Sequence, residues 1–404
     1  MSAVKVKLQQ LNERYQLVVN GQPFYIKGAG LEWGNIKSLA DFGGNAFRTW
    51  RVDNGKQSAL EILDCAQEHG LMVCMGLDVA RERHGFDYDD AQMVAQQKAL
   101  IEEDVQNLKD HPALLMWGIG NELNLRHKNP KVWNAVNELS KMIHREDPNH
   151  PTTTMLAGAE PEVISLVAEK CPDLDLLSFQ IYGAIDKLPR FVQESNYQGA
   201  YMITEWGPNG HWESPNTKWN VPIEQTSTEK ARSYRERYEM IFVDSTNCFG
   251  SYVFLWGFKQ ETTSSWYGLF LKDGTQTSVM DVLIEKWSGQ KPTNLAPDIN
   301  AFTINSLDAY QSVKVDKRSI MEVNIDAFDP NDDKLSYHIE IVPESTDTKA
   351  GGDFEKAPTA VFQKVFLNSE FRVKAPSKSG KYRLFVVIKD GEKGATANIP
   401  FLVN

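Results

Sequence analysis

Residues 114–122 read Leu-Leu-Met-Trp-Gly-Ile-Gly-Asn-Glu, an apolar run that ends directly in an amide and a carboxylate. A continuous apolar run without polar alternation is typical of a strand buried on both faces, as in a parallel sheet covered by helices. Residues 201–206, Tyr-Met-Ile-Thr-Glu-Trp, repeat the pattern and again place a carboxylate at the end of an apolar run. The two stretches predict a parallel sheet with acidic side chains at its carboxyl end.

Six further apolar runs have the length of strands, and amphipathic segments with helical spacing lie between them. The strand-like runs are residues 24–28, 46–50, 71–77, 152–156, 176–180 and 250–256. The helical segments include residues 58–68, 91–107, 131–146 and 228–244. Eight buried strands alternating with helices over about 250 residues predict a (β/α)8 TIM barrel of the α/β class. A doubly wound open sheet is the alternative, but no phosphate-binding motif marks its switch point.

The chain after Trp287 has a different composition, because all ten tryptophans lie between Trp33 and Trp287. Residues 288–298 are rich in Gly, Pro and polar residues, as linkers are. Strand-like alternation follows at residues 322–328, 335–342, 359–367, 382–389 and 396–403. Short strands separated by turns predict a small antiparallel sandwich. We therefore predict a barrel in residues 1–290 and a sandwich in residues 291–404.

Composition excludes several classes of partner. The net charge of −11 is a poor match for nucleic acid or an anionic membrane surface. No apolar run approaches the roughly 18–20 residues of a membrane span. The start, Met1–Lys7, lacks the apolar core of a secretory signal, which favours a cytoplasmic location. The cysteines and histidines have no metal-type spacing, so we expect no metal site. The sequence does not determine an oligomeric state.

Two glutamates stand where a barrel of this kind carries its chemistry, just past the carboxyl ends of strands. Glu122 follows the fourth predicted strand and Glu205 follows the seventh, three steps around the ring, so they face each other across the mouth. Carboxyl groups about 5 Å apart are the arrangement of a retaining glycosidase, with one acid/base and one nucleophile. Either glutamate alone is explained as an ion-pair partner, whereas the pair in this register indicates catalysis.

Other side chains follow the same strand ends. The charge of Arg48 would keep a neighbouring carboxylate ionised, although a structural cation at the barrel mouth explains it equally well. The Tyr182 hydroxyl would donate a hydrogen bond to that carboxylate or pack in the core. Asn121 would hold a sugar hydroxyl, and flat tryptophan faces suit the C–H side of a pyranose ring. The remaining predicted substrate contacts at the mouth are Glu32, Trp33, Trp50, Trp206 and Trp256.

These stretches resemble a known group of enzymes. Residues 117–123 resemble the Asn-Glu acid/base signature of the clan A glycoside hydrolases, and residues 203–207 resemble their nucleophile strand. Residues 19–28 and 146–151 are similar to the barrel of glycoside hydrolase family 2, the β-galactosidase and β-glucuronidase group. Residues 44–50 are equally similar to the fungal β-1,3-glucanosyltransferases of family 72. The resemblance extends from about residue 18 to about residue 287.

The resemblance implies that Glu122 is the acid/base and Glu205 the nucleophile. The positions that match the supporting residues of the clan are Arg48, Asn121, Tyr182 and Trp256. The chain departs from family 2 at Gln180, where the family commonly has Asn, and in having no sandwich domains between Met1 and the barrel. These departures bear on the substrate more than on the mechanism.

The tail carries a resemblance of its own. Residues 326–333 and the turn at residues 390–391 look like bacterial immunoglobulin-like or cadherin-like modules. Such modules usually imply export, so a periplasmic or secreted location is favoured, and a cytoplasmic location is the alternative.

The expected function is a retaining β-glycoside hydrolase that acts on a β-linked glucan or related oligosaccharide, with no cofactor. A transglycosylase on the same site is the nearest alternative, since a second sugar would replace the attacking water. A non-catalytic carbohydrate-binding protein is the alternative from another class.

Overall fold

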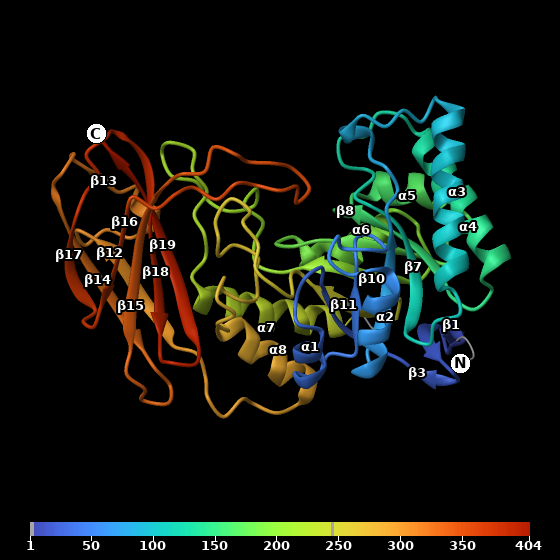
Figure 1. Ribbon diagram of the computed structural model, residues 1–404, viewed down its shortest axis with the longest axis horizontal. Helices are drawn as coiled ribbons and strands as arrows, with labels where there is room; N and C mark the ends of the chain where they lie inside the picture. Colours follow the sequence, from blue (N-terminus) through green and yellow to red (C-terminus); the bar gives the residue numbers. More distant parts are fainter. Residues whose placement is uncertain (1–3, 244–245) are drawn as a thin grey trace. The chain divides into compact units, whose positions relative to one another are not determined.

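The computed structural model describes residues 4–243 and 246–404, coloured along the chain in Figure 1. Contacts within the chain divide it into two compact units. The first comprises Met1–Trp206 with Arg237–Trp256, and the second comprises Gly207–Glu236 with Gly257–Asn404. The sequence-based boundary near residue 290 is not tested by this division and stays a prediction. The predictions that involve residues 1–3 and residue 244 lie outside the described residues.

The first unit contains a closed barrel of parallel strands, which confirms the predicted TIM barrel. In chain order the strands are β4 (Ile26–Gly30), β5 (Ala46–Arg48), β6 (Met72–Leu77), β7 (Leu114–Asn121), β8 (Thr152–Ala157), β9 (Leu176–Gln180), β10 (Tyr201–Trp206) and β11 (Cys248–Val253). Each strand pairs in parallel with its neighbours, and β11 closes the ring against β4. All residues of β7, β9, β10 and β11 are buried, as their apolar sequences predict.

Helices follow the strands as the alternating pattern predicts. They are α1 (Ile36–Asp41), α2 (Ala59–Glu68), α3 (Ala91–Leu108), α4 (Lys131–Glu146), α5 (Pro161–Lys170), α6 (Leu188–Glu194) and α7 (Ser227–Val243), with the short 3-10 helices η1 (Glu82–His84) and η2 (Ile185–Lys187). The start of α2 follows from its sequence: Ser58 and Glu61 form a capping box that satisfies the first free N–H groups. Within the described part of the chain, every helix is too short or too polar to cross a lipid bilayer.

A three-stranded antiparallel sheet precedes the barrel, where the sequence predicted none. It consists of β1 (Val6–Leu11), β2 (Arg14–Val19) and β3 (Gln22–Pro23). Val6 and Leu17 of this sheet share a core with the first residues of barrel strands, such as Ile26 and Ala46. The sheet therefore covers the amino-terminal end of the barrel, opposite to the end where the predicted site lies.

The second unit contains an all-β region that forms two sheets, in agreement with the predicted sandwich. One sheet has the order β12-β14-β17 and the other β13-β19-β18-β15-β16. Their bounds are β12 (Asp298–Ile304), β13 (Lys314–Val315), β14 (Ile320–Phe328), β15 (Ser336–Pro343), β16 (Phe362–Phe366), β17 (Glu370–Lys374), β18 (Gly380–Lys389) and β19 (Gly394–Val403). One hydrophobic core joins the two sheets, with fully buried members such as Met321, Leu384 and Phe401. The unit also holds α8 (Ser278–Ser288) and the 3-10 helix η3 (Ala309–Gln311). An immunoglobulin-like topology stays a prediction.

A buried polar network links distant parts of the second unit. Glu224 accepts hydrogen bonds from the ammonium of Lys230 at 2.6 Å, the hydroxyl of Thr263 at 2.6 Å and the amide of Asn398 at 2.7 Å. Arg383 donates to Asn398 Oδ1 at 2.7 Å. Burial alone would raise the pKa of Glu224, but the charge of Lys230 and these hydrogen bonds outweigh it and lower the pKa. The network therefore holds a charged carboxylate inside the unit.

The ion pair between His144 of α4 and Asp175 should make stability depend on pH. His144 Nε2 lies 2.8 Å from Asp175 Oδ2, and this hydrogen bond raises the pKa of the histidine. A raised pKa means that the stabilisation is complete below the unfolded value of about 6.5 and is lost as the pH rises through the folded value. The side chain is 37% exposed, so the effect should stay below about 1 kcal/mol.

The measurement compares wild type with His144→Gln, which keeps a donor for Asp175 but does not titrate. The wild-type advantage in the free energy of unfolding should be larger at about pH 6 than at about pH 9. An advantage that grows towards high pH would contradict the assignment of this ion pair.

Candidate active site

The candidate site lies at the carboxyl ends of barrel strands within the first unit. Arg48, Asn121 and Gln180 are the last residues of β5, β7 and β9, and Glu205 is the second-last residue of β10. Parallel strands place their ends at one rim of the barrel, so these side chains converge there. All of them are buried.

Each of the two strands that lead to the candidate glutamates carries an extra residue relative to a neighbour. Along β10, the two-residue step from Ile203 to Glu205 pairs with the one-residue step from Phe179 to Gln180 on β9. Along β7, the three-residue step from Gly118 to Asn121 matches a two-residue step on β8. An extra residue turns the side chains that follow it towards the other face of the sheet. The bulges therefore decide which way Asn121 and Glu205 point.

Glu205 is fixed by donors on both carboxylate oxygens. Its Oε1 accepts hydrogen bonds from Arg48 Nη2 at 3.1 Å, Trp50 Nε1 at 3.0 Å and Gln180 Nε2 at 3.0 Å. Its Oε2 accepts one from the Tyr182 hydroxyl at 3.0 Å. A buried carboxylate needs such partners, and hydrogen bonds to a charged group are strong. The carboxylate is thereby held in one orientation at the strand end.

Arg48 supplies the positive charge of this cluster. Its side chain is fully buried, and its guanidinium carbon lies 4.5 Å from the centroid of the Trp50 ring. Burial raises the pKa of the Cys74 thiol to about 12, and burial also raises the pKa of Tyr252 well above its usual value. These two buried groups stay neutral at neutral pH, so Glu205 is the acid that pairs with Arg48.

Glu122 follows β7 with an unusual backbone conformation. Its φ is 52°, and that of Gly120 is 75°, so the chain turns sharply after the strand. Arg83 Nη1 donates to the Glu122 carbonyl at 2.7 Å, and Arg83 Nη2 lies 3.7 Å from Glu122 Oε2. Asn121 is linked to Glu205 through Arg48 Nη2, which also donates to Asn121 Oδ1 at 2.8 Å. Arg48 Nη2 therefore bridges the Glu205 carboxylate and Asn121, the residue that precedes Glu122.

The structure brings together Arg48, Trp50, Asn121, Tyr182 and Glu205 at one rim, with Glu122 directly after Asn121. Their roles towards a substrate stay predictions. Sequence reasoning did not select Gln180 as a contact of Glu205, although its position at a strand end was a usable signal. It also did not select Arg83, which contacts Glu122.

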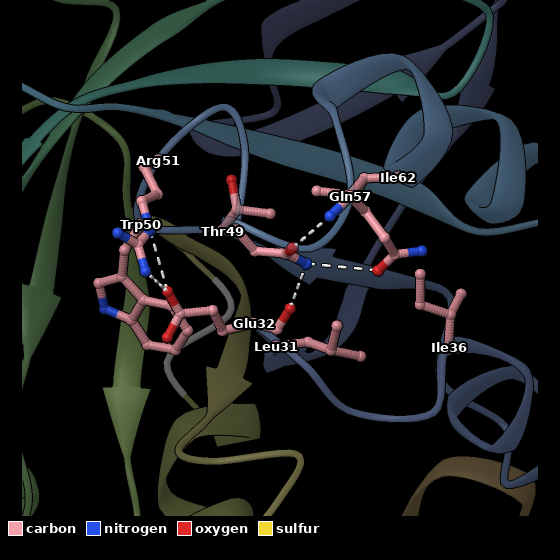
Figure 2. A pocket seen from close by; sticks show the side chains of 9 residues that line it. Leu31, Glu32, Ile36, Thr49, Trp50, Arg51, Gln57 and Ile62 are labelled. Atoms are coloured by element: carbon pink, nitrogen blue, oxygen red, sulfur yellow. Dashed lines mark hydrogen bonds and ion pairs between the residues drawn. The ribbon is translucent and has the colours of Figure 1, made fainter.

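Glu32 and Trp33 lie at the end of β4. Arg51 forms an ion pair with Glu32, with Arg51 Nε 3.0 Å from Glu32 Oε1. Figure 2 shows these two side chains facing each other beside Trp50, at a pocket formed by the ends of β4 and β5. Trp33 is 56% exposed, and its Nε1 donates to the Asn54 carbonyl at 2.8 Å. Lys56 Nζ lies 5.0 Å from the centroid of the Trp33 ring, so Trp33 and Glu32 each have a charged neighbour in the protein.

The rings of Trp206 and Trp256 require a correction, because both were predicted to offer flat faces to a sugar. Each is only 1% exposed. Trp206 Nε1 donates to Ser251 Oγ at 3.1 Å, and Trp256 Nε1 donates to Ser38 Oγ at 3.1 Å. Both indoles satisfy their polar group inside the protein, as buried tryptophans usually do. They pack as core residues and present no stacking face.

A metal-binding cluster is not found in the described part of the chain, where no group of three or more His, Cys, Asp and Glu side chains is arranged to hold an ion.

The Tyr182 hydrogen bond to Glu205 should matter for turnover. Tyr182→Phe removes this bond but keeps the ring, which packs edge-on against Phe254 with centroids 6.3 Å apart. A hydrogen bond to a charged group contributes about 1.5–3 kcal/mol, so kcat/KM should fall about 10- to 100-fold. The matched control is Tyr197→Phe, which removes a hydrogen bond to the Ala200 carbonyl and should leave kcat/KM within about twofold. Equal effects of the two changes would contradict a role of Tyr182 in the site.

Comparison with known proteins identifies similar sequences and similar solved structures. No protein-family model matches the chain. The chain is 30% identical over 125 residues to a β-glucuronidase from Pongo abelii, covering 26% of this chain and 18% of that protein. A β-D-glucuronidase structure from Dictyoglomus thermophilum has a TM-score of 0.55 and 17% identity, covering 71% of this chain and 54% of its own. The structure of β-glucuronidase 2 from Bacteroides uniformis, covalently bound to cyclophellitol-6-carboxylate aziridine, has a TM-score of 0.54 and 13% identity. The match covers 99% of this chain and 48% of that protein.

Fold and site thus define a (β/α)8-barrel protein with a carboxylate-centred site at the strand ends, followed by an all-β region. The chain is similar to the β-glucuronidases, which belong to the family 2 group that its motifs resemble. The similarity to family 72 is not shown by these comparisons. The chain spans only 18% of the length of the first curated relative and about half of the solved structures.

Proposed function

We propose that the protein is a β-glycoside hydrolase that works by double displacement with Glu122 and Glu205. The observation that carries the proposal is the Glu205 carboxylate, which four donors hold at the end of β10. Asn121, the last residue of β7, is linked to this carboxylate through Arg48, and Glu122 directly follows Asn121 in the chain. The sequence similarity to β-glucuronidases supports the same reaction class.

In the proposed reaction each carboxyl group has one task. Glu122 donates a proton to the oxygen of the leaving group while a Glu205 oxygen attacks the anomeric carbon and forms a glycosyl ester. Glu122 then takes a proton from a water molecule, whose oxygen attacks the same carbon and releases Glu205. Arg48 and Tyr182 keep the nucleophile oriented in both steps, because they contact its two oxygens. The side chains supply all groups that these steps need.

The proposed substrate is a β-linked glucan or related oligosaccharide. Trp33 is 56% exposed, and Trp50 donates a hydrogen bond to Glu205, so we assign both indoles as contacts for the C–H side of a sugar ring. The relatives are named as β-glucuronidases, so β-glucuronides belong among the compounds to test.

The test is a panel of aryl β-glycosides, including the glucoside, galactoside, mannoside and glucuronide, together with defined β-linked oligosaccharides. We expect hydrolysis of at least one compound, with the first product formed in the β configuration when followed by NMR. Release of the α product would overturn double displacement. Absence of turnover across the panel would overturn the proposed function and favour a carbohydrate-binding protein. Products longer than the substrate would show that the same site catalyses transglycosylation instead of hydrolysis.

A further inference from the structure

Gln180 occupies a central position in the cluster. It is the last residue of β9, it is 3% exposed, and it lies level with Glu205 on the neighbouring strand β10. On its other side it lies level with Ala157 of β8. Its side chain therefore extends into the barrel between the strands that carry the two candidate glutamates.

The amide of Gln180 donates two hydrogen bonds from one nitrogen. Its Nε2 lies 2.6 Å from Asn121 Oδ1 and 3.0 Å from Glu205 Oε1. A carboxylate oxygen only accepts, so the nitrogen of Gln180 must be the atom that faces Glu205. The side chain joins the end of β7 to the end of β10 through a single atom.

This arrangement also decides the orientation of Asn121. Its Oδ1 accepts from both Arg48 Nη2 and Gln180 Nε2, so the amide nitrogen must point away from these two donors. Without Gln180, Asn121 loses one of these two donors and Glu205 loses one of its donors. Both partners of Gln180 would then be less well oriented.

The other end of the Gln180 amide is unsatisfied. Its Oε1 is buried and has no hydrogen-bond partner. A buried acceptor without a partner destabilises the folded protein, and an apolar side chain of similar length would avoid this. The glutamine is therefore explained by the two hydrogen bonds that its nitrogen donates and not by its oxygen.

We infer that Gln180 is a positioning residue that orients Asn121 and Glu205 together. The inference rests on the proposed function, because the effect of this orientation is measured as a change in kcat. It predicts a loss of kcat with little change in KM when the amide is removed.

The first variant is Gln180→Met, which keeps the length of the side chain and removes its polar atoms. We expect kcat to fall about 10- to 100-fold on the best substrate of the panel, with KM changed less than about threefold. The melting temperature is measured alongside the kinetics to show that the variant is folded, because the substitution removes two donated hydrogen bonds together with the unsatisfied oxygen. Unchanged kcat in the folded variant would overturn the inference.

The second variant is Gln180→Glu, which replaces the donor by a carboxyl group. An ionised carboxylate cannot donate and faces another carboxylate, whereas a protonated one has a single O–H donor. The ratio of variant to wild-type kcat should therefore rise as the pH falls. A ratio that is independent of pH would overturn the inference even if Gln180→Met folded poorly.

The matched control is Ser178→Ala, on the same strand and buried to the same degree. Ser178 Oγ shares a hydrogen bond of 2.7 Å with Thr153 Oγ1, on the neighbouring strand β8. We expect kcat within about twofold of wild type, in contrast to the loss of about 10- to 100-fold expected for Gln180→Met. If wild type turns over no glycoside, the proposed function fails and this inference with it. If wild type is active and Gln180→Met keeps full kcat, the inference about Gln180 alone fails.

Discussion

The Glu205→Gln variant should lose at least about 10⁴-fold in kcat/KM on any aryl β-glycoside that the wild-type protein hydrolyses. An amide does not attack the anomeric carbon as a carboxylate does, so no glycosyl ester can form. The change is nearly isosteric, but it places an NH2 group beside donors such as Arg48 Nη2 and the Tyr182 hydroxyl. The melting temperature must therefore be measured alongside the kinetics.

The control for Glu205→Gln is Glu160→Gln. Glu160 is an exposed carboxylate that follows β8 at the same rim of the barrel. Its replacement should change kcat/KM by no more than about twofold. A folded Glu205→Gln protein that cleaves an aryl glycoside as fast as wild type would show that Glu205 is not the nucleophile.

The Lys230→Met variant should lose about 3–5 kcal/mol in the free energy of unfolding. The substitution leaves the Glu224 carboxylate buried without its positive partner, since the two lie 2.6 Å apart and their side chains are 6% and 1% exposed. Urea denaturation followed by tryptophan fluorescence measures the loss. This prediction does not depend on the proposed function.

Two controls separate the buried pair from the general effect of removing a lysine. Lys37 and Asp41 form an exposed ion pair, so Lys37→Met should change the free energy of unfolding by no more than about 0.5 kcal/mol. Adding Glu224→Gln to Lys230→Met removes the isolated charge and should recover part of the lost stability. A double variant that is less stable than Lys230→Met alone would contradict the explanation by an unpaired charge.

The sequence was sufficient to predict the barrel because buried parallel strands have a simple signature. Residues 114–121 and 201–206 form apolar strands in the positions expected for them. The all-β tail was likewise predicted from alternation, as in β14, whose residues alternate between buried and exposed over most of its length. The small sheet of β1–β3 was missed because its strands are short and mostly polar on one side.

The side-chain geometry of the site was less accessible from sequence. The positions of Arg48, Tyr182 and Glu205 follow from the ends of strands, whereas the direction of each side chain depends on bulges in β7 and β10 that arise from pairing with neighbouring strands. The burial of Trp206 has the same origin, since a register shift precedes it on β10, whereas Trp256 lies beyond the end of β11 and is fixed by its hydrogen bond to Ser38. Only the packing of the whole barrel decides these side-chain directions.

The buried network around Glu224 has a consequence for the order in which the protein matures during synthesis. Glu224 and Asn398 are 174 residues apart in sequence, and Pro222 and Arg383 are 161 apart. The ribosome synthesises Glu224 long before Arg383 and Asn398, which complete its surroundings. The second unit can therefore finish folding only after β19 has emerged. A nascent chain that stops near residue 290 would carry Glu224 and Lys230 without Asn398. Such a chain should be recognised by chaperones and proteases as incomplete, rather than accumulate as a free barrel.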